Sequence, residues 1–512
     1  MKILTLTPKS ATFELDGNLS PYFSGNNFLI ELNDKLVRQE NRNVFSVFGL
    51  APNTDYVCKV NGESVKFRTT QANLEISIEK FGALGDGIHD DTGAFNAAMN
   101  CLPENSILTV PAGTYSIKPV FMKSGIMIYL EKGAKICAAP ARGDYPILPG
   151  VLDGINCRRN IGTWQGEEDD CFASVFTAYA QNNIAIVGEG EIDCGAVQGD
   201  WYFNHRVKRG AWRPRGLFFN RCDGVTVLGI TVRNTPSWNI HPFFCSNVKL
   251  YDLVLENSSD MPTTDGIDPD CCTGVEIVGV KISVGDDCIS LKSGTYEFAK
   301  RYKTPCKGVT IRNCLMREGH GGVAFGSELS GGIEDVTVSK CLFEGTYRGL
   351  RIKTRRGRGR IGKCDGVTFS DIVMKSVKVP FVINMYYNMG DETGHTEYVW
   401  STEKLPVDER TPQIGSFVFK DMVCTGVEYA AAAFYGLPES PIKSITFDHV
   451  SFTYNENAEE GYAVMREKNV AVKNQGLDFK CVEKVLLKNV VISGQIGEPV
   501  LTEDVKKITI TK

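Results

Sequence analysis

One sequence pattern occurs three times in the centre of this chain, as CDGVTVLGI at 222–230, CSNVKLYDL at 245–253 and CTGVEIVGV at 272–280. Each copy has a cysteine three residues before a valine and an apolar residue five positions after that valine. Comparable runs begin at positions 225, 248, 275, 309, 336, 367, 418, 445 and 485. Short strands that recur every 23 to 51 residues, between Asn, Gly and Asp turns, predict a solenoid with stacked turns.

The predicted fold is all-β, a right-handed parallel β-helix over residues 73–512. The unequal spacing indicates loops of unequal length that leave the coil and shape one binding face. A β-propeller is the alternative, but it requires four strands per blade and a steadier period of about 40 to 50 residues. The recurring cysteines are expected to stack as small buried apolar side chains, with metal binding or redox chemistry as the alternative. They stand at positions 222, 245, 272, 306 and 364.

Residues 1–72 are predicted to form a separate small β-sandwich, because short β-prone runs alternate there with Gly, Asn and Pro turns. The segment GLAPNTDYVCKV at 49–60 resembles the Leu-x-Pro-x-Thr-x-Tyr corner of fibronectin type III domains. In that corner a tyrosine hydroxyl bonds back across the sheet, so Tyr56 is expected to be structural. The module could act as a spacer, a dimer contact or a wall beside the functional site.

The segment FGALGDGIHDDT at 81–92 precedes a helix-forming run at 92–100. This arrangement resembles the entry cap of pectin-degrading β-helices, where a short helix covers the open end of the coil. Three acids stand before the helix, at Asp86, Asp90 and Asp91. Capping of the helix start is the expected role, and a calcium loop is the alternative.

Bulk composition is that of a soluble globular protein, with 512 residues, a net charge of −5 and 17 cysteines. The acidic balance argues against nucleic acid as a partner. The first ten residues contain no signal-peptide core, and no run of about 18 apolar residues predicts a membrane span. The odd number of cysteines without framework spacing favours a reducing compartment, so a cytoplasmic location is expected. The oligomeric state is not defined by these features.

Four short motifs follow one another between residues 264 and 353. They contain Asp265, the pair Asp286-Asp287, His320, and the alternating cations Arg351 and Lys353. In a β-helix, residues one turn apart in sequence lie above one another. The intervals of about one turn therefore predict that these side chains meet in one groove.

The motifs resemble those of glycoside hydrolase family 28, the polygalacturonases, which carry Asn-Thr-Asp, Asp-Asp, Gly-His-Gly and Arg-Ile-Lys in this order. The resemblance covers the chain from about residue 75 to its end, and Thr263 replaces the usual asparagine. It implies hydrolysis of α-1,4-galacturonosyl linkages with inversion. It also implies that Asp286 is the general acid, that Asp265 and Asp287 hold and activate the water, and that His320 tunes the acid or binds substrate. No metal or cofactor is expected.

The residues support this chemistry independently. Glycosidic cleavage needs one carboxylic acid to protonate the leaving oxygen and one carboxylate as base or nucleophile. Clustered acids should also raise one pKa, although the sequence does not define which carboxyl keeps its proton. Arg351 and Lys353 alternate along a strand and should point to one side, as a clamp for a substrate carboxylate. Galacturonate oligo- or polysaccharide is therefore the expected partner.

The run 348–360 contains seven cations in 13 residues, which raises nucleic acid as a competing ligand. Without interleaved aromatic residues nucleic acid is disfavoured, and a solvated loop is the alternative for 355–360. Further candidates for substrate binding are Arg213, Arg215, Trp238 and His241. For each of the four, a purely structural role is the alternative.

Three insertions, at 141–180, 385–412 and 455–475, are long enough to wall one end of the groove, which favours exo action or trimming of imported oligomers. Three other functions stay open: a rhamnogalacturonan or xylogalacturonan hydrolase, a calcium-dependent pectate lyase-type β-helix, and a non-catalytic carbohydrate-binding β-helix.

Overall fold

A computed structural model describes residues 1–17, 20–154, 157–388 and 396–511. Its N-terminal part is the predicted small β-sandwich. One antiparallel sheet contains β1 (Lys2–Leu6), β2 (Ser10–Glu14) and β5 (Val44–Phe48), and the other contains β3 (Phe23–Leu32), β4 (Lys35–Arg42), β6 (Asp55–Val60) and β7 (Glu63–Arg68). Rings of Phe13, Phe45 and Phe67 pack between the two sheets. Alternating apolar residues on both sheets thus give this part its own core.

The corner predicted at Tyr56 is present. Its hydroxyl accepts a hydrogen bond from the backbone N–H of Ala51 at 2.9 Å, and its ring stacks on Phe67 at 5.6 Å. The bond closes the turn between the two sheets, as expected of a tyrosine corner. The relation to fibronectin type III modules stays a prediction.

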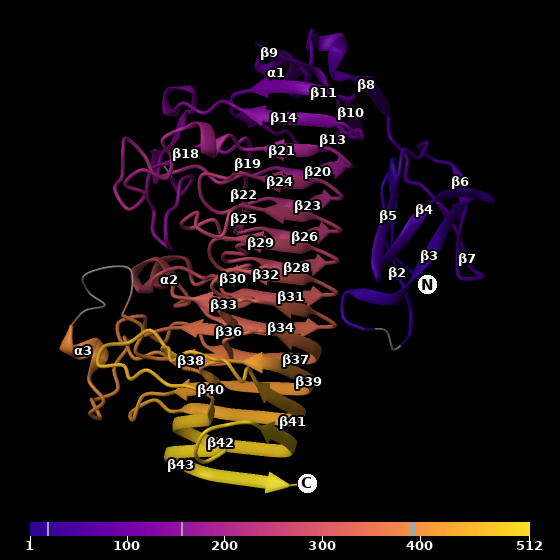
Figure 1. The fold of residues 1–512 in the computed structure, drawn as a ribbon. Coiled ribbons are helices and arrows are strands. Elements are labelled where there is room, and N and C mark those ends of the chain that lie inside the picture. Colours follow the sequence, from indigo (N-terminus) through magenta and orange to yellow (C-terminus); the bar gives the residue numbers. More distant parts are fainter. Residues whose placement is uncertain (18–19, 155–156, 389–395, 512) are drawn as a thin grey trace.

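The remainder is the predicted parallel β-helix (Figure 1). Its first strand is β8 (Leu74–Ser77), which follows β7 directly, so the predicted boundary near residue 72 lies between the two. Val225, Val248 and Val275 pair in register on β23 (Asp223–Leu228), β26 (Ser246–Tyr251) and β28 (Thr273–Val278). Within the described residues, 28 strands join into one continuous sheet. The nine-residue pattern is therefore one strand repeated turn after turn.

One strand start was predicted one residue too late. Val367 pairs with Phe417 rather than Val418, and Ile372 pairs with Met422 rather than Val423. Val423 is 45% exposed, whereas Phe417 and Met422 are buried. Side chains alternate along a strand, so a slip of one residue exchanges the inner and outer faces.

Apolar side chains fill the inside of the coil, and the recurring cysteines are among them. All five are buried free thiols, and the Cys245 N–H approaches the Cys272 sulfur at 3.4 Å, as expected for a stacked column. Helix α1 (Thr92–Cys101) covers the entry of the coil through Phe95, Ala98 and Met99, as predicted.

The acids before α1 are engaged by backbone amides. The Asp90 carboxylate accepts from the N–H of Thr92, the Asp86 carboxylate from those of Ile88 and His89, and the Asp91 carboxylate from that of Leu84. Of the three, Asp90 bonds to the first residue of the helix, whereas Asp91, at the N-cap position, makes no side-chain capping bond, so the expected capping is present only in part.

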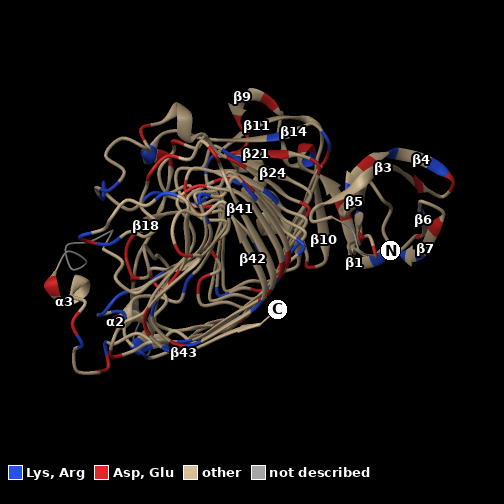
Figure 2. Ribbon diagram, turned by 60° about the horizontal axis from the view of Figure 1, so that its bottom comes forward, with Lys and Arg blue, Asp and Glu red and all other residues tan. Residues whose placement is uncertain are grey.

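The sandwich lies along the side of the coil. Arg42 pairs with Asp252, Arg312 with Glu14 at 2.7 Å, and Val44 packs beside Val278. Figures 1 and 2 both place the sandwich on the side opposite the loop that carries β18 (Cys171–Phe172). Three roles were considered for this module, and its position argues against one of them, that of a wall beside the functional site.

One face of the coil carries the functional residues. From top to bottom in Figure 1 its strands run from β22 to β40. They are β22 (Leu217–Asn220), β25 (Ile240–Phe243), β30 (Ile289–Leu291), β33 (Val323–Gly326), β36 (Arg348–Lys353), β38 (Val379–Asn384) and β40 (Ala430–Tyr435). Two further short helices, α2 (Tyr296–Tyr302) and α3 (Glu397–Trp400), leave the coil on this side. Among the described residues, no helix has the length and apolarity needed to cross a membrane.

Candidate active site

The three predicted acids meet on two adjacent turns. Ile267 pairs with Ile289 across the turns, and the N–H of Gly266 donates to the carbonyl of Asp287, which sets Asp265 beside Asp287. Carboxylate oxygens of Asp265, Asp286 and Asp287 lie within 4.8 Å of one another. Acids that are about one turn apart in sequence therefore lie together in space, as predicted.

Arg351 and Lys353 point to the same side of β36, as predicted, and both engage Asp287. The Arg351 Nη1 lies 2.9 Å from Oδ1 and the Lys353 Nζ lies 2.7 Å from Oδ2 of that carboxylate. Burial by itself would raise the pKa of Asp287, but the charges of Lys353 and Arg351 outweigh it and hold that pKa well below its usual range. Asp287 is therefore a buried carboxylate held ionised between two cations.

His320 lies beside Asp286, on the open side of the cluster. Its Nδ1 is 3.2 Å from Oδ1 of Asp286, and the side chains are 56% and 24% exposed respectively. The hydrogen bond to Asp286 raises the pKa of His320. Burial opposes ionisation of Asp286, yet the His320 bond keeps the pKa of this acid below its ordinary value. Of the three acids, Asp286 is the one that a ligand can reach from solvent.

Asp265 has a different environment. Burial raises its pKa strongly, and the nearby charges of Asp268 and Asp286 raise it further. The ammonium group of Lys292, whose Nζ lies 4.0 Å from Oδ2 of Asp265, works against this effect. Burial and the neighbouring acids thus favour the protonated form of Asp265, whereas the cations beside Asp286 and Asp287 favour the ionised forms of these two acids.

The four further candidates lie close to this cluster, but two of them are fully enclosed. Arg215 donates to the carbonyl of Thr163, and its guanidinium lies over the ring of Trp238 at 5.0 Å. His241 has no exposed surface, and burial lowers its pKa far below the ordinary value. The predicted substrate contacts of Arg215 and His241 are therefore corrected to internal, supporting positions. Thr163 and Trp164 of the loop at 160–168 lie against Arg215, and the rings of Phe218, Trp238 and Phe243 surround His241.

Arg213 and Trp238 lie at the edge of the site, each almost buried. Arg213 donates to the carbonyl of Pro236 at 2.7 Å and to the hydroxyl of Thr263, the residue that departs from the family motif. The ring of Trp238 lies 4.7 Å from the Lys292 ammonium. Whether they bind substrate stays a prediction.

The loop at 141–180 covers one end of the functional face. Leu148 and Cys171 pack on Phe218 and Phe243, whose side chains point outward from the sheet and are nevertheless buried. Trp164 of the same loop stacks between Trp212 and Trp238, at 4.9 and 5.9 Å with nearly parallel rings. Residues 155–156 of this insertion lie outside the described residues.

The opposite end is covered by the loop at 455–475. Its backbone carbonyls at Tyr462 and Met465 accept from Arg348 and Asn384, and the Met465 sulfur lies 2.8 Å from Nη2 of Arg351. The third predicted insertion, 385–412, lies partly outside the described residues, at 389–395. The acids thus lie between two covered ends of the face.

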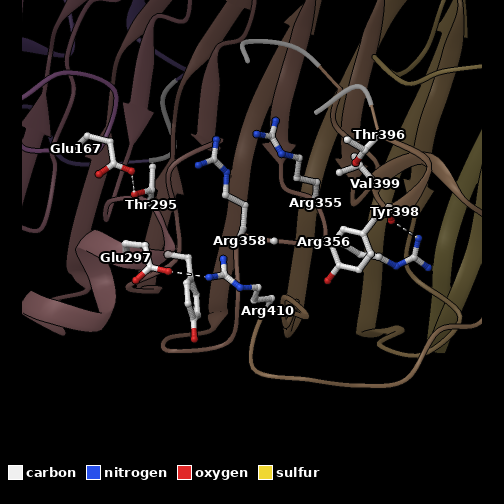
Figure 3. A pocket seen from close by; sticks show the side chains of 12 residues that line it. Glu167, Thr295, Glu297, Arg355, Arg356, Arg358, Thr396, Tyr398, Val399 and Arg410 are labelled. Carbon is white, nitrogen blue, oxygen red and sulfur yellow. Dashed lines mark hydrogen bonds and ion pairs between the residues drawn. The ribbon is translucent and has the colours of Figure 1, made fainter. Parts of the chain in front are cut away.

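The basic run at 348–360 is largely internal rather than a solvated loop. Arg356 pairs with Glu439 and donates to the carbonyls of Tyr398 and Ser401, and Arg358 donates to Ser327 Oγ at 3.0 Å. Arg355, Arg356, Arg358 and Arg410 line a cavity of about 420 Å³ beside α2 (Figure 3). These guanidiniums therefore hold loops against the coil.

Sequence reasoning missed Lys292 and Glu328. The Lys292 Nζ lies 3.4 Å from Asp268 and 3.6 Å from Glu328, so both residues belong to the electrostatics of the cluster. A signal was present for Lys292, because it occupies the same column of the face as Lys353, two turns away. Trp164 and Met465 come from loops without a repeat, where no comparable signal exists.

The comparisons with known proteins agree with this geometry. The model of the family "Glycosyl hydrolases family 28" matches residues 106–460, and that of "Rhamnogalacturonase A/epimerase, pectate lyase-like" matches 75–134. A probable polygalacturonase of Vitis vinifera is 28% identical over 387 residues, covering 73% of each chain. An exopolygalacturonase of Zea mays is 24% identical over 447 residues, covering 83% of this chain and 96% of that protein.

Two solved structures share the fold. The family 28 exopolygalacturonase of Yersinia enterocolitica superposes with a TM-score of 0.73 at 18% identity, covering 99% of this chain and 97% of its own. The exopolygalacturonase of Thermotoga maritima gives 0.65 at 24% identity, covering 78% and 94%. The family model spans more than half of the chain and includes all four motifs, and the chain therefore belongs to glycoside hydrolase family 28.

Proposed function

We propose that this glycoside hydrolase cleaves α-1,4-galacturonosyl linkages in polygalacturonate or oligogalacturonides, from a chain end and with inversion. The observation that carries the proposal is the arrangement of Arg351 and Lys353 beside the three acids. Two cations on one strand, next to hydrolytic carboxyls, suit a sugar that itself bears a carboxylate. The polygalacturonases among the relatives act on such a sugar.

Asp286 is proposed as the general acid, because it is the most exposed of the three and lies next to His320. Its carboxyl must be protonated at the moment of cleavage, whereas the free site keeps its proton on Asp265. When a substrate carboxylate pairs with Arg351 and Lys353, it neutralises the charges that hold Asp287 ionised. The proton affinity of the adjacent Asp286 and Asp287 then rises, so the proton passes to Asp286 and Asp265 becomes a base.

The stereochemical proposal rests on the state of the other two acids. The acids lie within 4.8 Å, closer than the about 6.5–9.5 Å usual in inverting enzymes and nearer to the spacing in retaining ones. A retaining mechanism, however, needs a free carboxylate nucleophile. The side chains of Asp287 and Asp265 are both buried, at 0% and 6% exposure, which favours the holding of a water over attack on the sugar.

Exo action is supported by the covered ends of the face. The loop at 141–180 buries outward-facing Phe218 and Phe243, and the loop at 455–475 lies against Arg348 and Arg351. An open groove would admit the interior of a long chain, whereas a face covered at both ends admits a terminus.

We also propose that the enzyme trims oligomers in a reducing compartment. Of the 17 cysteines, the sixteen whose side chains are described are free thiols, most of them buried inside the coil. Exposed Cys101 is an exception, and it would be prone to oxidation in an oxidising compartment.

The test is a digest of di-, tri- and polygalacturonate, followed by product sizing and by NMR of the first anomer released. We expect monomer or dimer as the early product, with the anomeric configuration inverted. An early ladder of oligomers would contradict exo action, and a retained anomer would contradict the assignment of the water. An unsaturated product that absorbs in the ultraviolet and disappears with chelator would replace the hydrolase by a lyase.

A further inference from the structure

Each of the three acids has its own cationic neighbour. Asp286 lies beside His320, and Asp287 lies between Arg351 and Lys353. The cationic neighbour of Asp265 is Lys292, which directly follows β30, one turn further along the coil. The first two sets lie in the family motifs recognised in the sequence, whereas Lys292 lies outside them.

Lys292 is enclosed. Its side chain is 4% exposed, and the ring of Trp238 covers the ammonium at 4.7 Å. Burial disfavours its charge, but the charges of Asp268 and Glu328 outweigh that effect and raise the pKa of Lys292 above its ordinary value. A permanent positive charge is therefore fixed behind Asp265, shielded from water, where Coulomb interactions are strong. The side chain is too enclosed to serve as a contact for the sugar.

Asp268 opposes Lys292 in its effect on Asp265. It lies on the same turn as Asp265, has no exposed surface, and its Oδ1 is 3.4 Å from the Lys292 ammonium. Burial raises the pKa of Asp268 to about 7 although Lys292 acts to lower it. When ionised, Asp268 both repels charge on Asp265 and draws the ammonium toward itself.

We propose that Lys292 is a positioning residue that allows Asp265 to ionise and act as the base, and that Asp268 sets the strength of this effect by competing for the same ammonium. During turnover the substrate carboxylate occupies Arg351 and Lys353, so Lys292 is the cation that stays with Asp265. The inference rests on the proposed role of Asp265 in hydrolysis.

The groups that face this centre come from several turns of the coil and all contribute to its field. On the turn of Asp265 they include Asp268 and Asp270, and on the next turns Asp286, Asp287, Glu328 and Lys353. On the preceding turns they include Arg213, Arg215 and His241. Substitution of Lys292 or Asp268 leaves all the other groups in place, so the difference between the two variants reports on this pair alone.

The experiment compares Lys292→Met, Lys292→Arg and Asp268→Asn with the wild type across pH on trigalacturonate. The acidic limb of kcat follows ionisation of the base in the enzyme–substrate complex. We expect its midpoint to rise by about one pH unit or more in Lys292→Met, with kcat about tenfold lower and KM changed less. In Asp268→Asn the midpoint should move down, and in Lys292→Arg it should stay near the wild-type value.

A merely structural role would lower activity in both variants without moving the two midpoints in opposite directions. Parallel shifts, or no shifts in folded proteins, would therefore overturn the inference. If Lys292→Met does not fold, the double variant with Asp268→Asn replaces it, because both buried charges are then removed. The double variant must have a midpoint above that of Asp268→Asn alone, and equal midpoints would count against the proposal.

A second readout is independent of turnover. Carbon-13 NMR of aspartate-labelled protein, with Asp265→Asn to assign the signal, follows the Asp265 carboxyl directly. Its titration midpoint should be higher in Lys292→Met than in the wild type, and an unchanged midpoint would overturn the inference. If the wild type cleaves no galacturonide, the proposed function fails while this titration still decides the role of Lys292.

Discussion

Lys353 is bound to Asp287 through a 2.7 Å contact between Nζ and Oδ2, so a cation expected to hold the substrate is already paired with one of the active-site acids. Substrate binding and the charge state of the acids are therefore linked. A carboxylate that enters the site must exchange partners with Asp287, and this exchange favours the protonation of Asp286 required for cleavage.

Replacement of Lys353 by Met should raise KM for trigalacturonate and also lower kcat. The value of kcat/KM should fall by about tenfold or more, because one charge-assisted hydrogen bond is lost. Steady-state kinetics would measure this effect. Lys363→Met is the matched control, since Lys363 is an exposed lysine of the same coil that pairs with Asp365. An unchanged KM in Lys353→Met would mean that the substrate carboxylate lies elsewhere.

Asp286→Asn should lower kcat by roughly 10²–10⁴-fold, because an amide cannot donate the proton that the leaving oxygen needs. Circular dichroism and melting should be close to those of the wild type, since the side chain is partly exposed. Asp371→Asn, at an exposed position of β37 (Cys364–Lys375) in the same coil, serves as control and should retain full activity. Residual activity of half or more in Asp286→Asn would exclude it as the general acid.

The ionised state of Glu328 leads us to expect a defined decrease in the free energy of unfolding in acid. Burial would raise its pKa, but Lys292 and Arg358 lower it to about 2 in the folded protein. A depressed pKa contributes stability that is present above the unfolded value and is lost as pH falls toward 2. The wild type should therefore lose about 3 kcal/mol through this group between about pH 4.5 and 2.

Denaturant unfolding across this pH range should give a flatter curve for Glu328→Gln than for the wild type. The control is Glu456→Gln at an exposed position, whose curve should parallel that of the wild type. Parallel curves for Glu328→Gln and the wild type would mean that Glu328 is not held ionised by Lys292 and Arg358.

The loop at 455–475 can be shortened at a natural closure point. Gly461 and Val472 exchange two backbone hydrogen bonds, at 3.0 and 2.8 Å, so residues 462–471 can be replaced by a two-residue turn. Removal uncovers Arg348 and Arg351, and the variant should release longer oligomers from polygalacturonate than the wild type does. Chromatography of early products would detect the change, and unchanged products in a folded variant would show that this loop does not confine the chain end.

Tyr56→Phe tests the corner of the sandwich. Loss of the bond to the Ala51 N–H should lower the stability of the protein's N-terminal part by about 1 kcal/mol, without effect on kcat. Thermal unfolding monitored by fluorescence would measure this loss, with Tyr462→Phe on an exposed side chain as the control. A change in kcat would connect the sandwich to the active site.

The sequence by itself determined the coil and the alignment of its catalytic residues. Strand repeats place Asp265 beside Asp287, and alternation along β36 sends Arg351 and Lys353 to one side. These relations follow from local rules, namely one turn per repeat and a side-chain period of two. The one-residue slip at Val418 marks the limit of such rules, because the strand there offers apolar residues on both faces.

Only the tertiary structure decided what covers the face and which charges lie beneath it. Arg215 is internal because a loop from residues 160–168 packs over it, and Lys292 lies beside Asp265 because strand β30 of the next turn ends there. The covering loops contain no repeat, and they meet the face through contacts between residues far apart in the chain. Spacing along the sequence carries no information about such contacts, so the alignment of the acids was predictable while their burial and their counter-charges were not.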